Sequence, residues 1–181
     1  MRKAPWNFSQ GKAVSDLALR PLRWRDTLWC QRLAADPLTR AMSSDPSLPT
    51  LVKHLRWMGR HIAHETAWVA IRPGEAWTYT HRRRGLAQVK RGPDGRLWIG
   101  ITVAPEWRGI RLATPLIEAA TQRILRQWPN EQAVWAEVKR ENLASQAAFK
   151  AAGYELFPYY AEPEPARVFV YPRSENGRWA A

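Results

Sequence analysis

The sequence has little of what several common protein classes depend on. It contains one cysteine, Cys30, so no disulfide can form within the chain, and we expect a buried thiol and a reducing, cytoplasmic location. No run of about 18 apolar residues occurs, which argues against a membrane-spanning helix. Residues 1–15 lack a continuous apolar segment as well, and we expect a loose arm there rather than a secretory signal.

Metal ligands and acidic residues are also scarce. The four histidines, at positions 54, 61, 64 and 81, have no cysteine or carboxylate partners at ligand spacing, so we expect no metal site. Acidic residues number 16 against 28 basic ones, and the net charge is +12. Such a surface attracts polyanions. The basic residues are scattered along the chain, except for the cluster "HRRRG" (81–85). Scattered charge is weak evidence for nucleic-acid binding, so we expect nucleic acid to be a disfavoured partner, although the net charge does not exclude it.

What is present predicts a single α/β domain over 16–172, followed by a tail at 173–181. Apolar and polar residues alternate, as in strands, over these segments: 16–26, 66–74, 76–81, 85–92, 96–105, 133–140, 154–160 and 166–172. Caps and helical periodicity predict helices in four places: from Asp26 to about 36–37, after Thr50, from 111–112, and over 143–152. This order predicts a mixed sheet with helices on both faces.

The stretch "VAPEWRGIRLATPLIEAA" (103–120) carries the clearest chemical pattern. An apolar strand ends at Pro105, the chain turns at Gly109, and an amphipathic helix follows. The first N–H groups of a helix have no acceptor within it, and with the helix dipole they attract phosphate. Glycine lets the backbone approach such an anion closely. The pattern predicts an anion site at 108–113, although an ordinary strand-to-helix turn would explain it too.

A second motif makes the pattern more specific. After the strand at 133–140, the chain has Asn142, Ser145 and Phe149, then Gly153-Tyr154. Together with the loop Arg108-Gly109-Ile110-Arg111-Leu112-Ala113, this resembles the GNAT family of acyl-CoA N-acyltransferases, whose phosphate loop reads Gln/Arg-x-x-Gly-x-Gly/Ala. The resemblance covers about 16–172. It implies an α/β fold with a twisted, mostly antiparallel central sheet and helices on both faces.

The resemblance also implies that acetyl-CoA is the cofactor. The backbone of Ile101, Thr102 and Val103 would pair with the pantetheine arm, because the strands near 102 and 135 would splay apart. The pyrophosphate would lie on the loop residues: Arg108, Gly109, Ile110, Arg111, Leu112 and Ala113. Further cofactor contacts would come from the second helix motif: Asn142, Ser145 and Phe149 near the thioester, and Lys150 near the nucleotide.

Two residues depart from the family pattern. Arg111 stands where the family has a second loop glycine. A positive φ would cost arginine about 1 kcal/mol against glycine, and we expect instead a helical φ with the guanidinium near phosphate. Phe149 stands where many members have a tyrosine that protonates the leaving thiolate. Either water or another hydroxyl takes that role (Tyr154, Tyr159 or Tyr160), or the thiolate, a fairly good leaving group, needs little help.

The reaction also needs a base, because an alkyl ammonium has a pKa near 10 and the attacking amine must be neutral. Three residues are candidates. Glu137 lies on the polar side of its strand with Trp135, His54 lies on the helix after Thr50, and Glu106 follows a strand end. A structural role explains each of them better than a catalytic one.

The acceptor is predicted from the segment 39–58. Its helix has a core stripe at Leu51, Leu55, Met58 and Ile62, with His54, Trp57 and His61 beside it. The segment is similar to one in GNAT enzymes that acetylate the amino group of nucleotide-linked sugars. That similarity implies an acceptor pocket formed by four residues: Arg40, Ser43, His54 and Trp57.

The sequence leaves other functions open. A GNAT enzyme of this kind could instead acetylate a protein N-terminus, or the fold could serve as a basic nucleic-acid-binding module with an unused cofactor site. We expect a small-molecule amine as the main partner, no membrane, and a homodimer as one arrangement to test. The acceptor itself and the length of the acyl chain are not encoded in any motif.

Overall fold

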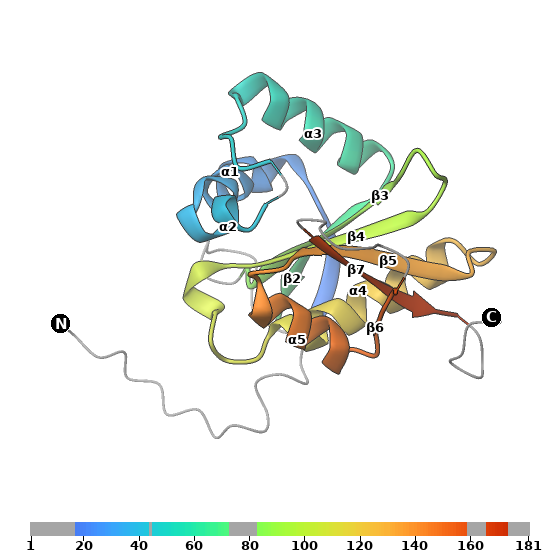
Figure 1. Ribbon diagram of the computed structural model, residues 1–181. Coiled ribbons are helices and arrows are strands. Elements are labelled where there is room, and N and C mark those ends of the chain that lie inside the picture. Colours follow the sequence, from blue (N-terminus) through green and yellow to red (C-terminus); the bar gives the residue numbers. More distant parts are fainter. Residues whose placement is uncertain (1–16, 44, 73–82, 159–165, 174–181) are drawn as a thin grey trace.

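The structure is a computed structural model that describes residues 17–43, 45–72, 83–158 and 166–173. Its centre is a seven-stranded sheet in the order β1-β2-β3-β4-β5-β7-β6 (Figure 1). The strands have these bounds: β1 Ala18–Pro21, β2 Ala67–Ile71, β3 Gly85–Arg91, β4 Leu97–Val103, β5 Ala133–Lys139, β6 Glu155–Leu156 and β7 Ala166–Pro172. Neighbouring strands are antiparallel except β4 and β5. The predicted mixed, mostly antiparallel sheet is therefore confirmed.

Helices cover both faces of this sheet (Figure 1). One face carries α1 (Thr27–Ala35), α2 (Pro37–Ala41) and α3 (Leu51–Ala63). The other carries α4 (Ala113–Gln127) and α5 (Leu143–Ala151). Short 3-10 helices lie at Trp24–Asp26 and Pro105–Trp107. Within the described ranges, no helix is long and apolar enough to cross a membrane.

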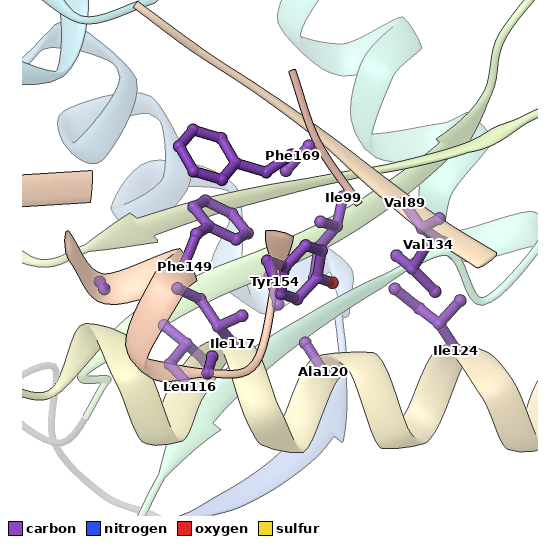
Figure 2. Close-up of a cluster of buried hydrophobic side chains, with 14 of the residues drawn as sticks. Val89, Ile99, Leu116, Ile117, Ala120, Ile124, Val134, Phe149, Tyr154 and Phe169 are labelled. Atoms are coloured by element: carbon purple, nitrogen blue, oxygen red, sulfur yellow. The ribbon is translucent and has the colours of Figure 1, made fainter. Parts of the chain in front are cut away.

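Two apolar clusters hold the helices to the sheet. The larger packs α4 and α5 against the central strands, where α4 buries Leu116, Ile117, Ala120 and Ile124 (Figure 2). The alternation of strand side chains places Leu97 and Ile99 in this cluster. The smaller packs α1 and α3 against β2 and β3, and includes Cys30. Cys30 is 3% exposed, so the predicted buried cysteine is confirmed, and burial raises the pKa of its thiol to about 12.

Several predicted details differ from the structure. The first strand is four residues long, and Asp26 does not cap α1 with its side chain. Asp26 is fully buried and instead accepts hydrogen bonds from Arg20, Arg83 and the backbone N–H of Arg23. Two guanidinium groups and a backbone N–H take the place of the helix cap, because a buried carboxylate must be paired.

The buried face of α3 is also rotated relative to the prediction. Leu51 and Leu55 are 57% and 39% exposed, whereas His54, Met58 and His61 are buried. Periodicity located the helix and Thr50 caps it as predicted, through Lys53 N–H at 3.3 Å. The choice between two adjacent stripes depends on polar partners for the histidines, which periodicity does not reveal. The predicted extended segment 76–81 and Tyr159 and Tyr160 lie outside the described residues.

Candidate active site

The two parallel strands β4 and β5 separate soon after their first residues. They pair at Leu97 with Val134 and at Trp98 with Trp135, and no further β5 partner is recorded for β4 over the described residues. On its other side β4 pairs with β3 along its full length, from Leu97 to Val103. The predicted splay of the strands is therefore confirmed, and it begins directly after Trp98 and Trp135.

A cleft of about 1010 Å³ opens where the strands separate. Its cofactor side is formed by β4 from Ile99 to Val103, the loop before α4, and the first turns of α4 and α5. Its other end is bounded by α2 and the residues after it, by Gln88 of β3, and by Glu137 and Lys139 of β5. The cleft thus has a cofactor end, formed by β4, the loop and the starts of two helices, and an acceptor end, formed by α2, β3 and β5.

The loop before α4 presents unpaired backbone donors to the cleft. Gly109 has φ +80°, and a Cβ built there would have no heavy atom within 4 Å, so the space before it is open. No acceptor is recorded among the described residues for the N–H groups of 109–114. Helix α4 begins at Ala113, one residue later than predicted, and its first intrahelical bond runs from Leu116 N–H to Leu112 C=O at 3.2 Å. Pro115 lies in the first turn, where N–H groups have no acceptor within the helix, so its missing N–H costs no hydrogen bond.

The backbone of Arg111 corrects a prediction. Its φ is +61°, in the left-handed region, and not helical as expected. The loop therefore keeps the geometry that a second glycine would give it, and arginine bears a strain of about 1 kcal/mol. Its side chain is exposed at the edge of the cleft.

Arg108 connects the loop to α2 across the cleft. Its guanidinium donates to Asp36 Oδ2 at 2.6 Å and to Thr39 Oγ1 at 3.0 Å, while its Nε donates to the Val103 carbonyl at 3.3 Å. Asp36 caps α2 by accepting from Thr39 N–H at 2.8 Å. The hydrogen bond from Arg108 lowers the pKa of Asp36 to about 2. The side chain of Arg108 is thus engaged by the protein, and its backbone N–H donates to the Pro105 carbonyl at 3.3 Å. The donors left for a phosphate are the N–H groups that follow it in the loop.

The second motif lies on α5 as predicted. Asn142 caps the helix by accepting from Ser145 N–H at 3.1 Å, and both residues line the cleft with Phe149. Phe149 is 3% exposed and packs edge-on against Tyr154, with ring centroids 4.9 Å apart (Figure 2). Lys150 and Ile110 are exposed and do not line the cleft.

Two of the predicted catalytic residues lie outside the cleft. Tyr154 is 2% exposed, its hydroxyl is 2.7 Å from Thr121 Oγ1, and burial raises its pKa. His54 is 4% exposed, with Nε2 3.1 Å from the Thr27 carbonyl. Glu106 is exposed on the 3-10 helix and does not line the cleft. Glu137, by contrast, is exposed on β5 and does line it.

The predicted acceptor residues separate into two pairs. Arg40 and Ser43 line the cleft, at α2 and directly after it. Trp57 and His54 lie behind the lining, where Trp57 Nε1 donates to Gln88 Oε1 at 3.0 Å and the two rings stack with centroids 5.9 Å apart. Trp57 can therefore act on the cleft only through Gln88.

Sequence reasoning missed α2 as a separate helix, although it predicted Arg40, which α2 brings to the cleft. Asp36-Pro37 marks its start, since aspartate is a preferred N-cap and proline a preferred first helical residue. It missed Gln88 and Lys139 as well. Lys139 Nζ donates to the Ala41 carbonyl at 2.8 Å and so joins β5 to α2. No local pattern marks either residue, because their role depends on which segments meet in space.

Comparison with known proteins decides the family. Residues 16–155 match the family model described as "Acetyltransferase (GNAT) domain". The chain belongs to the GNAT acetyltransferase family. No curated protein matches the whole sequence significantly.

Solved structures share this GNAT fold at low sequence identity. A spermidine N-acetyltransferase from Vibrio cholerae, in complex with CoA and spermine, has 17% identity and a TM-score of 0.66 over 86% of this chain and 94% of that one. An acetyltransferase from Agrobacterium tumefaciens has 18% identity and a TM-score of 0.68 over 94% and 99% of the two chains. An aminoglycoside acetyltransferase in complex with coenzyme A has 17% identity and a TM-score of 0.65 over 87% and 95%.

This GNAT enzyme is an N-acetyltransferase that uses acetyl-CoA, and its cleft fits that cofactor. An extended chain such as pantetheine can pair with the edge of β4 that β5 leaves unpaired from Ile99 onward. A pyrophosphate can accept from the free N–H groups of the loop, with no side chain in front of Gly109. Both features lie on one wall of the cleft.

Proposed function

We propose that the protein acetylates the primary amine of a small, hydroxylated acceptor of the amino-sugar type, held between α2 and β5. Bound acetyl-CoA supplies the activated acetyl group. The backbone of Ile101, Thr102 and Val103 holds its pantetheine arm and loop 108–113 its pyrophosphate. The observation that carries the proposal is the second end of the cleft, which is lined by polar side chains and lies beyond the unpaired edge of β4.

Glu137 is the base in this proposal. It alternates with Val134, Ala136 and Val138, which face the α4 cluster, so its side chain projects from the opposite face of the sheet. It is exposed within the cleft, where a carboxylate can accept a proton from an ammonium group directly or through one water. His54 cannot serve in this way while it is buried against the Thr27 carbonyl.

The leaving thiolate requires a proton, and Phe149 has none to give. Tyr154 is committed to Thr121 and lies behind Phe149. Ser145 lies one helical turn before Phe149 and lines the cleft, so its hydroxyl is placed on the same side of α5. We assign it, or water, to this proton transfer.

The charges at the cleft disfavour a polyamine acceptor. The basic side chains that line the cleft are Arg40, Arg108, Arg111 and Lys139, against the acidic Glu137 and Glu141. The bond from Lys139 to the Ala41 carbonyl also ties β5 to α2 at the acceptor end, and an end closed in this way favours a small acceptor over a polypeptide. A polyamine would need several carboxylates, whereas hydroxyl or phosphate oxygens suit this lining.

A nucleotide-linked amino sugar is the finer form of the proposal. Arg40 and Ser43 support it, because both line the cleft and a guanidinium suits a diphosphate. Arg40 Nη1 donates to the carbonyls of Asp45 and Ser47, both at 3.1 Å, and its Nε is buried without a partner among the described residues. Trp57 gives less support, since it does not reach the cleft wall.

The test is a thiol-release assay with acetyl-CoA and four acceptors: D-glucosamine, a UDP-linked amino sugar, spermidine and a short peptide. We expect turnover with the two sugars and the lowest KM for the UDP-linked one. Arg40→Ala should raise that KM by about tenfold, the worth of one charge-assisted hydrogen bond, and leave the KM of glucosamine nearly unchanged. Arg126→Ala, an exposed arginine near the end of α4, is the charge-matched control. Faster turnover of the peptide or of spermidine would contradict the proposal.

A further inference from the structure

Three residues form a row across the sheet at the acceptor end of the cleft. Gln88 of β3 pairs directly with Gly100 of β4. The parallel register of Leu97 with Val134 and Trp98 with Trp135, continued by two residues, places Glu137 of β5 level with Gly100 across the split. All three lie on the face opposite the α4 cluster, because their strand neighbours Val89, Ile99 and Ala136 belong to that cluster.

The orientation of the Gln88 amide is fixed from behind. Trp57 Nε1 donates to Gln88 Oε1 at 3.0 Å, and an indole N–H can only donate. The amide oxygen must therefore face Trp57, and the NH₂ group faces the other way. No acceptor for this NH₂ group is recorded among the described residues, and Gln88 lines the cleft. The result is a pair of oriented N–H donors at the cleft wall.

Gly100 has no side chain, and the Gln88 side chain lies over it. A Cβ built on Gly100 would lie 3.0 Å from Gln88 Nε2 and 3.2 Å from its Cγ, closer than side chains normally pack. The Gln88 NH₂ group therefore lies over the middle of the row, and Glu137 stands beyond it across the split. Paired strands are about 5 Å apart, and the separation of β4 from β5 widens this distance, which leaves room for an acceptor between the amide and the carboxylate.

We propose that the Gln88 amide determines acceptor specificity by donating to an oxygen of the acceptor while the amine of that acceptor faces Glu137. This inference rests on the proposed function and deepens it by naming the residue that distinguishes a hydroxylated amine from a bare alkyl amine. An N–H donor rewards a hydroxyl, carbonyl or phosphate oxygen and repels a second ammonium group. Trp57 is a positioning residue here, because it acts on the acceptor through the orientation of Gln88.

The first experiment compares two amines of similar size with and without oxygens. Initial rates with D-glucosamine and with cyclohexylamine give the ratio of their kcat/KM values in the wild type and in Gln88→Glu. Glutamate keeps an oxygen for Trp57, so the fold is not left with a buried orphan donor. We expect the ratio to favour glucosamine in the wild type and to fall by about tenfold in the variant, since one hydrogen bond is lost. Gln122→Glu, an exposed position on α4, is the matched control and should leave the ratio unchanged.

The second experiment measures acceptor binding by NMR and does not depend on turnover. In ¹⁵N-labelled protein saturated with CoA, the side-chain NH₂ signals of Gln88 are identified by their loss in Gln88→Glu. We expect these signals to shift on titration with D-glucosamine and to stay in place with cyclohexylamine. Trp57→Phe removes the N–H that orients the amide, and we expect it to lower the kcat/KM ratio by about threefold, less than Gln88→Glu does.

The outcomes separate the two proposals. An unchanged kcat/KM ratio in Gln88→Glu, or NH₂ signals of Gln88 that do not respond to glucosamine, overturns the specificity role even when both amines are acetylated. If glucosamine shifts those signals but no amine in the assay releases thiol from acetyl-CoA, the recognition role stands and the proposed reaction fails.

Discussion

The two ends of the cleft are built in different ways. The cofactor end consists mainly of backbone from one continuous stretch, which runs from Ile99 on β4 through the loop into Ala113 at the start of α4. The acceptor end consists of side chains from three segments far apart in the sequence: α2, β3 and β5. Backbone binding of phosphate requires a glycine and a helix start, and both are visible in a sequence. Side-chain recognition depends on how strands far apart in the sequence are aligned in the sheet, and this register is not visible in a sequence.

The largest expected effect comes from the acceptor end alone. Glu137→Gln removes the proposed base and should lower kcat by about a hundredfold or more, with the affinity for CoA within about twofold of the wild type. Kinetics and calorimetry with CoA measure the two. Glu141→Gln removes the same charge from the same cleft and should change kcat far less. An equal loss of kcat in both variants would mean that negative charge in the cleft promotes the reaction and that Glu137 does not act as the base.

A substitution in the loop should break the cofactor end alone. Gly109→Val places a β-branched residue at φ +80°, which costs about 1–2 kcal/mol or displaces the N–H groups of the loop. We expect the Kd of CoA to rise by about tenfold or more. Gly95→Val is the control, because Gly95 has the same φ of +80° and no heavy atom within 4 Å of a built Cβ, but lies in the β3–β4 turn away from the cleft. Equally weakened CoA binding in both variants would mean that the effect is not specific to the loop, and it would contradict the assignment of the pyrophosphate to this loop.

The two ends are joined by the hydrogen bond between Arg108 and Asp36, and pH should reveal its contribution. The pKa of Asp36 is about 2 in the folded protein, below its ordinary 3.8. A lowered pKa stabilises the fold above pH 3.8 and ceases to do so as the pH falls toward 2. Asp36→Asn should therefore lower the free energy of unfolding by about 1 kcal/mol at pH 7, and by progressively less below pH 4.

Urea unfolding of the wild type and Asp36→Asn between pH 7 and pH 2 measures this difference. Arg108→Gln should cause a similar loss, and the double variant should cost less than the sum of the two, because each change removes the same interaction. A difference that stays constant down to pH 2 would show that the charge of Asp36, and so its pairing with Arg108, does not stabilise the fold, because asparagine caps a helix about as well as aspartate.

The same contrast explains how much could be predicted from the sequence. Seven of the eight predicted strand segments, four helices and the caps at Thr50 and Asn142 follow from local patterns and are present in the structure, although the first strand is shorter than predicted. The eighth segment, 76–81, lies outside the described residues. The left-handed Arg111, the rotated face of α3 and the place of Gln88 at the cleft do not. The last of these depends on a partner far away in the sequence, because Trp57 of α3 donates to Gln88 of β3.

The smallest expected effect tests whether Arg111 contributes to the cofactor end or only occupies it. Arg111→Gly should raise the free energy of unfolding by up to about 1 kcal/mol, because glycine adopts the φ of +61° without strain. The same change removes an exposed guanidinium, so the Kd of CoA should rise by less than about tenfold and become less sensitive to salt. Glu65→Gly is the matched control, since Glu65 is the other described non-glycine residue with positive φ, at +49° after α3. It should gain similar stability and leave CoA binding unchanged. If Arg111→Gly instead binds CoA more tightly, the arginine makes no phosphate contact, and the backbone of the loop holds the pyrophosphate alone.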